Sequence, residues 1–299
     1  MRAIYDIGVI HIEVTNACNL QCSSCTRFVG HHSKPFSMDL ETVERGLRSL
    51  QDFPNKIGLM GGEPTIHPQF VEICELYRNM IPEKSKRCFW TNGANWNKYE
   101  DIILDTFYPQ NIVYNDHKNP EGVHQPLMIA AKDIIDDEEL MWELIDDCWI
   151  QERWSASITP KGGFFCEVAA AQDMLFNGPG GYMTEKGWWN KTPADYRDQV
   201  ERYCINCSAA IPLPRIKSKT GKDLVSSSVY QELRNISSPK LFNNEIELFD
   251  SRINRKEIKE NRKNWSPWSH RNFKQCTPGL FLNETNQLVD INGNVYENC

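Results

Sequence analysis

Three cysteines stand close together near the start of the chain, in the segment CNLQCSSC at residues 18–25. Cys18, Cys22 and Cys25 have the spacing C-x3-C-x2-C, so three thiolates in one short loop can hold three irons of a [4Fe–4S] cube. Three ligands leave one iron open for the amino and carboxylate groups of a second ligand. Thiolates also select zinc, so the spacing alone leaves open a zinc loop with a distant fourth ligand.

Two further motifs end strand-like runs. Gly61, Gly62, Glu63 and Pro64 end the second run, and Thr91-Asn92-Gly93 ends the third. A glycine pair lets the backbone approach a ligand closely, and the Glu63 carboxylate is suited to an ammonium group. The polar residues expected to face a site at these strand ends are Glu13, Asn16, Arg27, Asn115, Asp116 and His117.

Alternating strands and helices are predicted to position these residues. The strand-like runs are 9–15, 56–62, 87–93, 111–116, 126–131 and 154–159. Between them, Ser37 is the expected N-cap of a first helix, and apolar residues at helical spacing mark 70–77 and 137–148. This alternation predicts a parallel sheet with helical crossovers, whose ligand site lies at the carboxyl ends of the strands.

The three motifs, in this order and each at the end of a strand, resemble those of the radical S-adenosylmethionine (SAM) superfamily. The resemblance implies an α/β fold, a partial (βα)6 barrel over residues 1–159, with a [4Fe–4S] cluster on Cys18, Cys22 and Cys25. The implied SAM-binding residues are Gly61, Gly62, Glu63, Pro64, Thr91, Asn92 and Asn115. One departure is Ser24, which stands where the family usually has an aromatic residue near adenine; Phe28 is the candidate replacement.

A second group of cysteines follows. Thr159 to Cys166 is typical of a hairpin that ends in a thiol, and Cys204-Ile205-Asn206-Cys207 is a C-x2-C knuckle. The arrangement resembles a twitch or SPASM extension, here residues 160–299, and implies an auxiliary iron–sulfur cluster on Cys166, Cys204 and Cys207. The fourth ligand stays open between Cys148, Cys276, Cys299 and Asp173. A zinc knuckle or unliganded thiols are the alternatives, and Cys148 is predicted first as a core residue.

The resemblance implies a 5′-deoxyadenosyl radical that takes a hydrogen atom from a small-molecule substrate, such as a carbohydrate or aminocyclitol. Epimerisation or dehydrogenation follows, and the partner is an electron donor such as flavodoxin or ferredoxin. Cys276 lies in a loop before Pro278 and is a candidate catalytic hydrogen donor, an auxiliary ligand or a core thiol. Peptide modification and a non-catalytic electron-transfer or scaffold protein are the alternatives. Only eight residues precede the first strand, which argues against an N-terminal peptide-binding domain.

Composition limits the remaining possibilities. With a net charge of −7, 40% apolar residues and no apolar stretch of membrane-spanning length, the chain predicts neither a nucleic-acid nor a membrane partner. Eleven cysteines without a secretion signal favour a cytoplasmic metalloprotein. The basic segment 252–274 is a solvated helix face or an anionic-ligand site, and His31-His32 either covers the cysteine loop or is solvated.

Overall fold

A computed structural model describes residues 1–115, 117, 122–153, 156–265, 280–282, 287–290 and 293–296. The strands are β1 (Val9–Glu13), β2 (Lys56–Met60), β3 (Arg87–Thr91), β4 (Ile112–Tyr114), β5 (Val123–His124), β6 (Ser157–Thr159), β7 (Gly162–Phe164), β8 (Ile216–Lys217), β9 (Asp223–Val225), β10 (Ile246–Leu248), β11 (Leu280–Leu282), β12 (Leu288–Asp290) and β13 (Val295–Tyr296). The α-helices are α1 (Leu40–Ser49), α2 (Phe70–Met80), α3 (Trp96–Thr106), α4 (Ala131–Ile134), α5 (Glu138–Asp146), α6 (Ile150–Arg153), α7 (Glu167–Leu175), α8 (Arg197–Tyr203), α9 (Ser227–Asn235), α10 (Pro239–Phe242) and α11 (Arg255–Arg262).

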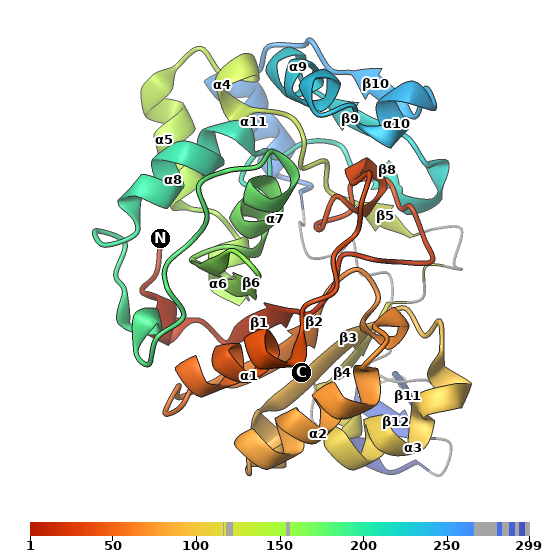
Figure 1. The fold of residues 1–299 in the computed structure, drawn as a ribbon. Coiled ribbons are helices and arrows are strands. Elements are labelled where there is room, and N and C mark those ends of the chain that lie inside the picture. The colour runs from red at the N-terminus through yellow and green to blue at the C-terminus, as the bar shows by residue number, and fades with distance from the viewer. Residues whose placement is uncertain are drawn as a thin grey trace.

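A six-stranded sheet with the order β4-β3-β2-β1-β6-β7 forms the centre of the fold. Its first five strands are parallel, and β7 pairs antiparallel with β6. Helices α1, α2 and α3 pack together along the sheet, and the later helices gather on the other side of the molecule (Figure 1). The α/β class and five of the predicted strands are confirmed.

The fifth predicted strand, residues 126–131, is wrong. Within the described residues this segment adds no strand to the sheet, and Met128 makes one isolated parallel bridge with Val225. The Ala130 N–H donates to the Ser226 hydroxyl at 2.9 Å. The run is buried against residues from much later in the chain, so its apolar character reflects burial without pairing in the sheet.

Helices α1 and α5 each begin at an aspartate whose side chain caps the helix. Asp39, rather than the expected Ser37, caps α1 by accepting the Thr42 N–H at 2.7 Å. Asp137 caps α5 in the same way through Leu140, at 3.0 Å. The predicted apolar stripe of α2 is confirmed, because Phe70, Ile73, Cys74 and Tyr77 are all buried.

The predicted hairpin after Thr159 is confirmed as β6 and β7. Its turn ends on Gly162, whose φ of 115° is a conformation that residues with a Cβ rarely adopt. Since this hairpin pairs within the main sheet, the sheet continues past Thr159 to Phe164. The division into domains 1–159 and 160–299 stays a prediction.

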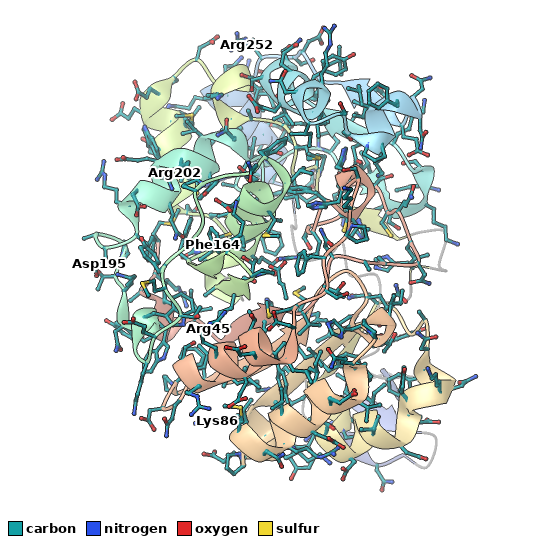
Figure 2. All side chains as sticks on the ribbon, viewed as in Figure 1. Arg45, Lys86, Phe164, Asp195, Arg202 and Arg252 are labelled. Atoms are coloured by element: carbon teal, nitrogen blue, oxygen red, sulfur yellow. The ribbon has the colours of Figure 1, made fainter. Side chains whose placement is uncertain are left out.

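Arg45, Asp195 and Arg252 lie at the periphery of the molecule, while Phe164 is buried (Figure 2). The basic face of α11 is paired within the molecule: Arg255 contacts Glu143 at 2.7 Å, and Arg262 contacts Asp147 at 3.0 Å. These acids belong to α5 or follow it, which favours the solvated helix face. Arg271 and Lys274 lie outside the described residues. No described helix is both long and apolar enough to cross a membrane.

Candidate functional site

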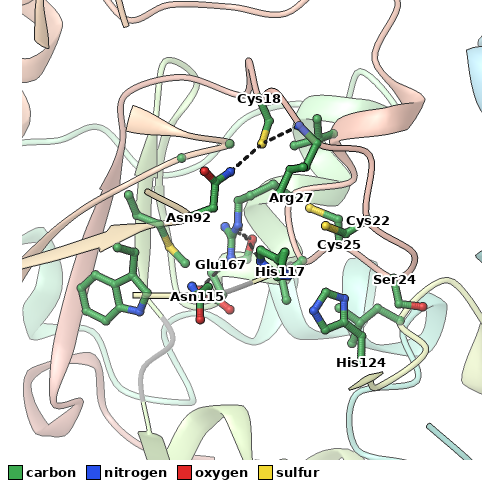
Figure 3. Close-up of a pocket in the computed structure, with 18 of the residues that line it drawn as sticks. Cys18, Cys22, Ser24, Cys25, Arg27, Asn92, Asn115, His117, His124 and Glu167 are labelled. Atoms are coloured by element: carbon green, nitrogen blue, oxygen red, sulfur yellow. Dashed lines mark hydrogen bonds and ion pairs between the residues drawn. The ribbon is translucent and has the colours of Figure 1, made fainter. Parts of the chain in front are cut away.

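Cys18, Cys22 and Cys25 line one cavity of about 140 Å³, at the carboxyl ends of the central strands (Figure 3). The same cavity is lined by Gly61, Gly62, Thr91, Asn92 and Asn115, which follow or end β2, β3 and β4. Five parallel strands therefore bring together residues that lie almost a hundred positions apart. Three thiols and two of the predicted binding loops meet where parallel-sheet folds place their ligands.

The thiols of the cysteine loop are set for a metal cluster. Burial, together with the charges of neighbouring cysteines, raises the pKa of Cys18 and of Cys22 to about 12. The Asn92 side-chain amide donates to Cys18 Sγ at 3.5 Å, and the Leu20 N–H donates at 3.4 Å. Three thiolates this close repel one another unless positive metal ions compensate their charge. The donor set therefore fits an iron–sulfur cluster.

Gly61 and Gly62 lie against the backbone that leads into the cysteine loop. A Cβ at Gly61 would collide with the Thr15 carbonyl, and one at Gly62 with the Ala17 carbonyl. The Gly62 N–H donates to Thr15 at 2.7 Å, and the Glu63 N–H donates to Ala17 at 2.8 Å. Because neither residue has a Cβ, the glycine pair can lie directly against the backbone that leads into the cysteine loop, and a ligand can approach it closely.

Glu63 and Pro64 do not line the cavity. The buried Glu63 carboxylate accepts the Thr91 hydroxyl at 2.8 Å and the Asn92 N–H at 2.6 Å, and it also caps the turn at Thr65. These contacts hold the loop after β3 in place, and the pairing of Glu63 with an ammonium group stays a prediction. Pro64 begins the 3-10 helix Pro64–Ile66.

The aromatic side chain in the cavity differs from the expected one. The Phe28 N–H donates to the Cys25 carbonyl at 3.0 Å, but its side chain is buried in the core and lines another cavity. Trp90, at the end of β3, lines the cavity instead. Gly58 leaves room for its ring to meet His11 edge-on at 4.4 Å. Trp90 was missed because it reads as an ordinary strand residue; its place directly before Thr91-Asn92 was the available signal.

The indole N–H of Trp90 has no hydrogen-bond partner within the described part of the chain, although the side chain is 94% buried. A buried donor without a partner is unfavourable. An oxygen or nitrogen acceptor on a bound molecule would satisfy it.

Arg27 joins the cavity to the second half of the chain. Its guanidinium contacts Glu13 and lies 2.7 Å from Glu167, and both carboxylates are buried. Burial raises the pKa of Glu13, against the opposing effect of Arg27. Since Arg27 follows Cys25 by two residues and Glu167 follows Cys166 directly, this pair links the two cysteine groups. Asn115 and His117 also line the cavity, whereas Asp116 lies outside the described residues.

A second, smaller cavity of about 30 Å³ is lined by Cys148, Cys166, Cys204 and Cys207. Burial raises the pKa of Cys148 to about 11 and of Cys207 to about 12. Burial and the charges of the other three thiols raise the pKa of Cys204 well above its usual range. The structure therefore brings together all three predicted auxiliary ligands with a fourth thiol, and this donor set fits a second cluster.

Of the four candidates for the fourth ligand, Cys148 is the one that the structure places in this cavity. Asp173 is occupied elsewhere, by Lys161 at 2.6 Å and by the Tyr203 hydroxyl at 2.6 Å. Cys276 and Cys299 lie outside the described residues. The spacing of Cys148, eighteen residues before Cys166, was a signal that its place on an apolar helical stripe obscured.

The nine described cysteines are all free thiols. In the described ranges, no three His, Cys, Asp or Glu side chains are close enough to hold a single metal ion. A four-iron cube binds each thiolate through a different iron, so its ligands stand further apart than those of one ion. Cys74 and Cys88, the predicted core cysteines, are buried.

One family model matches the N-terminal part of the chain. Residues 12–105 match the model of the Radical SAM superfamily, and this segment contains the cysteine loop and both binding loops. The match covers less than half of the chain, and over these residues the chain is similar to the radical SAM superfamily.

Individual relatives are similar over limited lengths. The GTP 3′,8-cyclase of Alkaliphilus metalliredigens is 28% identical over 102 residues, which are 33% of this chain and 32% of the relative. The 7,8-dihydro-6-hydroxymethylpterin dimethyltransferase of Methanocaldococcus jannaschii is 33% identical over 73 residues, 23% of this chain and 14% of the relative. The chain thus spans about a third or less of these relatives.

Among solved structures, BtrN in complex with AdoMet and 2-DOIA aligns with a TM-score of 0.41 and 16% identity, over 67% of this chain and 92% of that chain. Streptococcus suis SuiB bound to S-adenosylmethionine aligns with a TM-score of 0.30 and 12% identity, over 81% of this chain and 50% of that chain.

Proposed function

We propose that this chain is a radical SAM enzyme that removes a hydrogen atom from a small-molecule substrate bound in the cavity of Cys18, Cys22 and Cys25. The observation that carries the proposal is the meeting of the three thiols with Gly61, Gly62 and Asn92 in that single cavity. When bound, the cluster and SAM supply a 5′-deoxyadenosyl radical. The chain's own residues hold the cluster, orient SAM and bind the substrate.

Polar side chains on the far side of the cavity support a small polar substrate. His117 and His124 line it together with Arg27, and Trp90 offers its indole N–H. Arg27 is paired with the Glu13 and Glu167 carboxylates, so this wall offers hydrogen-bonding groups without a free positive charge. A hydroxylated or aminated molecule, such as a carbohydrate or aminocyclitol, suits such a wall.

We further propose that Cys148, Cys166, Cys204 and Cys207 hold an auxiliary cluster in a twitch-like extension. A cluster there supplies an electron acceptor, which dehydrogenation requires. Epimerisation requires a hydrogen donor instead; the lining of the first cavity holds no described thiol beyond the three of the loop, and Cys276 lies outside the described residues. We therefore favour dehydrogenation, with an electron donor such as flavodoxin or ferredoxin as partner.

The test is anaerobic reconstitution with iron and sulfide, followed by SAM cleavage under dithionite. Two clusters require about eight irons per chain. Replacing Cys18, Cys22 and Cys25 with Ala should remove about four irons and reduce 5′-deoxyadenosine formation to background. Undiminished cleavage in this triple variant would refute the enzyme assignment. No cleavage in the wild type would favour an electron-transfer or scaffold protein.

Turnover in D2O separates the reaction types. A thiol donor exchanges with solvent, so an epimerised product carries one deuterium at the inverted carbon, and Cys276→Ala abolishes inversion while SAM is still cleaved. An oxidised product without deuterium supports dehydrogenation. Modification of a short peptide, and not of small molecules, would instead establish the peptide alternative.

A further inference from the structure

The cysteine loop, residues 18–25, rests against residues 216–245 from the second half of the chain. The Ser23 N–H donates to the carbonyl of Ser218 at 2.9 Å. The hydroxyl of Ser23 lies 2.7 Å from that of Thr220. The backbone of the loop is thus held by a segment that carries none of the cysteines.

Asp223 is the centre of this contact. Its carboxylate accepts the N–H of Ser24, the ammonium of Lys240 at 2.6 Å and the His31 Nε2 at 3.0 Å. Asp223, Lys240 and His31 are 1–2% exposed. Burial alone would raise the pKa of Asp223, but His31 and Lys240 outweigh it and hold the pKa below its usual value. The carboxylate therefore stays charged inside the protein.

The hydrogen bond from Ser24 to Asp223 fixes an unfavourable backbone conformation. Its φ of 50° places it in the left-handed region, which serine seldom occupies. Such strain persists where surrounding contacts fix it. Because Ser24 directly precedes Cys25, the Asp223 carboxylate fixes the turn between the second and third thiols.

Lys240 reaches the loop from the other side. Its ammonium donates to the Cys22 carbonyl at 3.2 Å, and its stem passes over Gly30, where a Cβ would collide with it. Burial raises the pKa of Cys22, and the charge of Lys240 acts against this effect. Lysine is almost never fully buried unless it is paired; Asp223 is the partner that holds the Lys240 ammonium next to the loop.

We propose that Asp223 and Lys240 are positioning residues of the first metal site. Asp223 fixes the turn at Ser24, and Lys240 places a positive charge beside Cys22 that favours the more negative, reduced form of a cluster held there. The inference rests on the proposed function only for the second of these roles.

The first role is tested on the iron-free chain by hydrogen exchange of the peptide that contains Ser24. Asp223→Ala removes the acceptor and should speed exchange about tenfold or more. Asp223→Asn keeps an oxygen at the same place and should stay within about threefold of the wild type. Equal exchange in the wild type and in Asp223→Ala would overturn this role.

The second role is tested on reconstituted protein by the midpoint potential of the cluster signal that responds to SAM. Lys240→Met should shift the potential to more negative values. The double variant Asp223→Asn with Lys240→Met removes both charges and should return towards the wild-type potential. An unchanged or more positive potential in Lys240→Met would refute the charge effect.

The double variant separates an effect on the cysteine loop from a failure of the protein to fold. The double variant leaves no uncompensated buried charge, so it should fold even if Asp223→Ala or Lys240→Met does not; rapid Ser24 exchange in that folded double variant would overturn the role of the Asp223 position. If no form shows a SAM-responsive cluster, the proposed function fails, while the exchange measurement still decides the role of Asp223.

Discussion

The two cysteine sites are built in different ways. The first takes its three thiols from one eight-residue loop, lines an open cavity of about 140 Å³ and has one ligand fewer than a cube requires. The second takes four thiols from three separate places in the chain, around about 30 Å³. A short loop with a missing ligand leaves room for a substrate and a cofactor, whereas a closed set of four suits a cluster that only exchanges electrons.

The two cysteine sites are also connected through shared residues. Ile150 lines both cavities, and the Arg27–Glu167 pair joins the residues that follow Cys25 and Cys166. The two sites therefore share supporting residues, although each has its own thiols.

The largest effect is expected from removal of the fourth thiol. Cys148→Ala should reduce iron from about eight to about four per chain, because the described lining of this cavity has no His, Asp or Glu to take the place of the fourth thiol. Iron analysis after desalting measures this. Cys88→Ala, a buried thiol of β3 outside both cavities, is the control and should keep its iron. Full iron in Cys148→Ala together with loss in Cys276→Ala would assign the fourth ligand to Cys276.

The Arg27→Met substitution removes the ion pairs that join the two cysteine sites. The change leaves the Glu13 and Glu167 carboxylates buried without their cation, so we expect a loss of about 3–5 kcal/mol in the free energy of unfolding. Urea denaturation of the iron-free chain measures it. Arg45→Met, an exposed arginine, should change stability by less than about 0.5 kcal/mol. A loss below about 1 kcal/mol at Arg27 would contradict the buried network.

The first site alone is disturbed by Gly62→Ala. The new Cβ meets the Ala17 carbonyl, so the cysteine loop must move, at a cost of about 1–3 kcal/mol. About four irons should be lost and about four kept. Gly46→Ala in α1 meets only ordinary contacts from 3.5 Å and should be neutral or stabilising. Equal loss of iron from both sites in Gly62→Ala would argue against their independence.

The smallest effect concerns pH. Burial, followed by the charge of His31, lowers the pKa of His32 from 6.5 to about 4. The unfolded chain binds a proton in this window and the folded chain does not, so stability is present above pH 6.5 and falls as the pH drops towards 4. His32→Gln should make this decline shallower in urea titrations at several pH values. The second cavity contains no histidine in its lining, so its variants should leave the slope unchanged.

The first site could be predicted from the sequence because its parts are short motifs at the ends of strands. Cys18, Cys22 and Cys25 meet the Gly61-Gly62 and Thr91-Asn92 loops as the parallel sheet requires. The second site was predicted only in part, since Cys148 has the spacing of a core residue. Asp223 and Lys240 lie in no motif, and their contacts with the cysteine loop depend on tertiary packing that no local pattern encodes.

The separation between the cysteine loop and Lys240 also sets an order of events during synthesis. The contact from Lys240 to Cys22 spans 218 residues. At about 5–20 residues per second, a ribosome needs about 10–45 s to add that length. Throughout this time the three thiols are already made but have no partner at Asp223 or Lys240. Iron delivered to a nascent chain would thus meet an unsupported loop, and insertion of the cluster into the finished polypeptide is the route that this architecture favours.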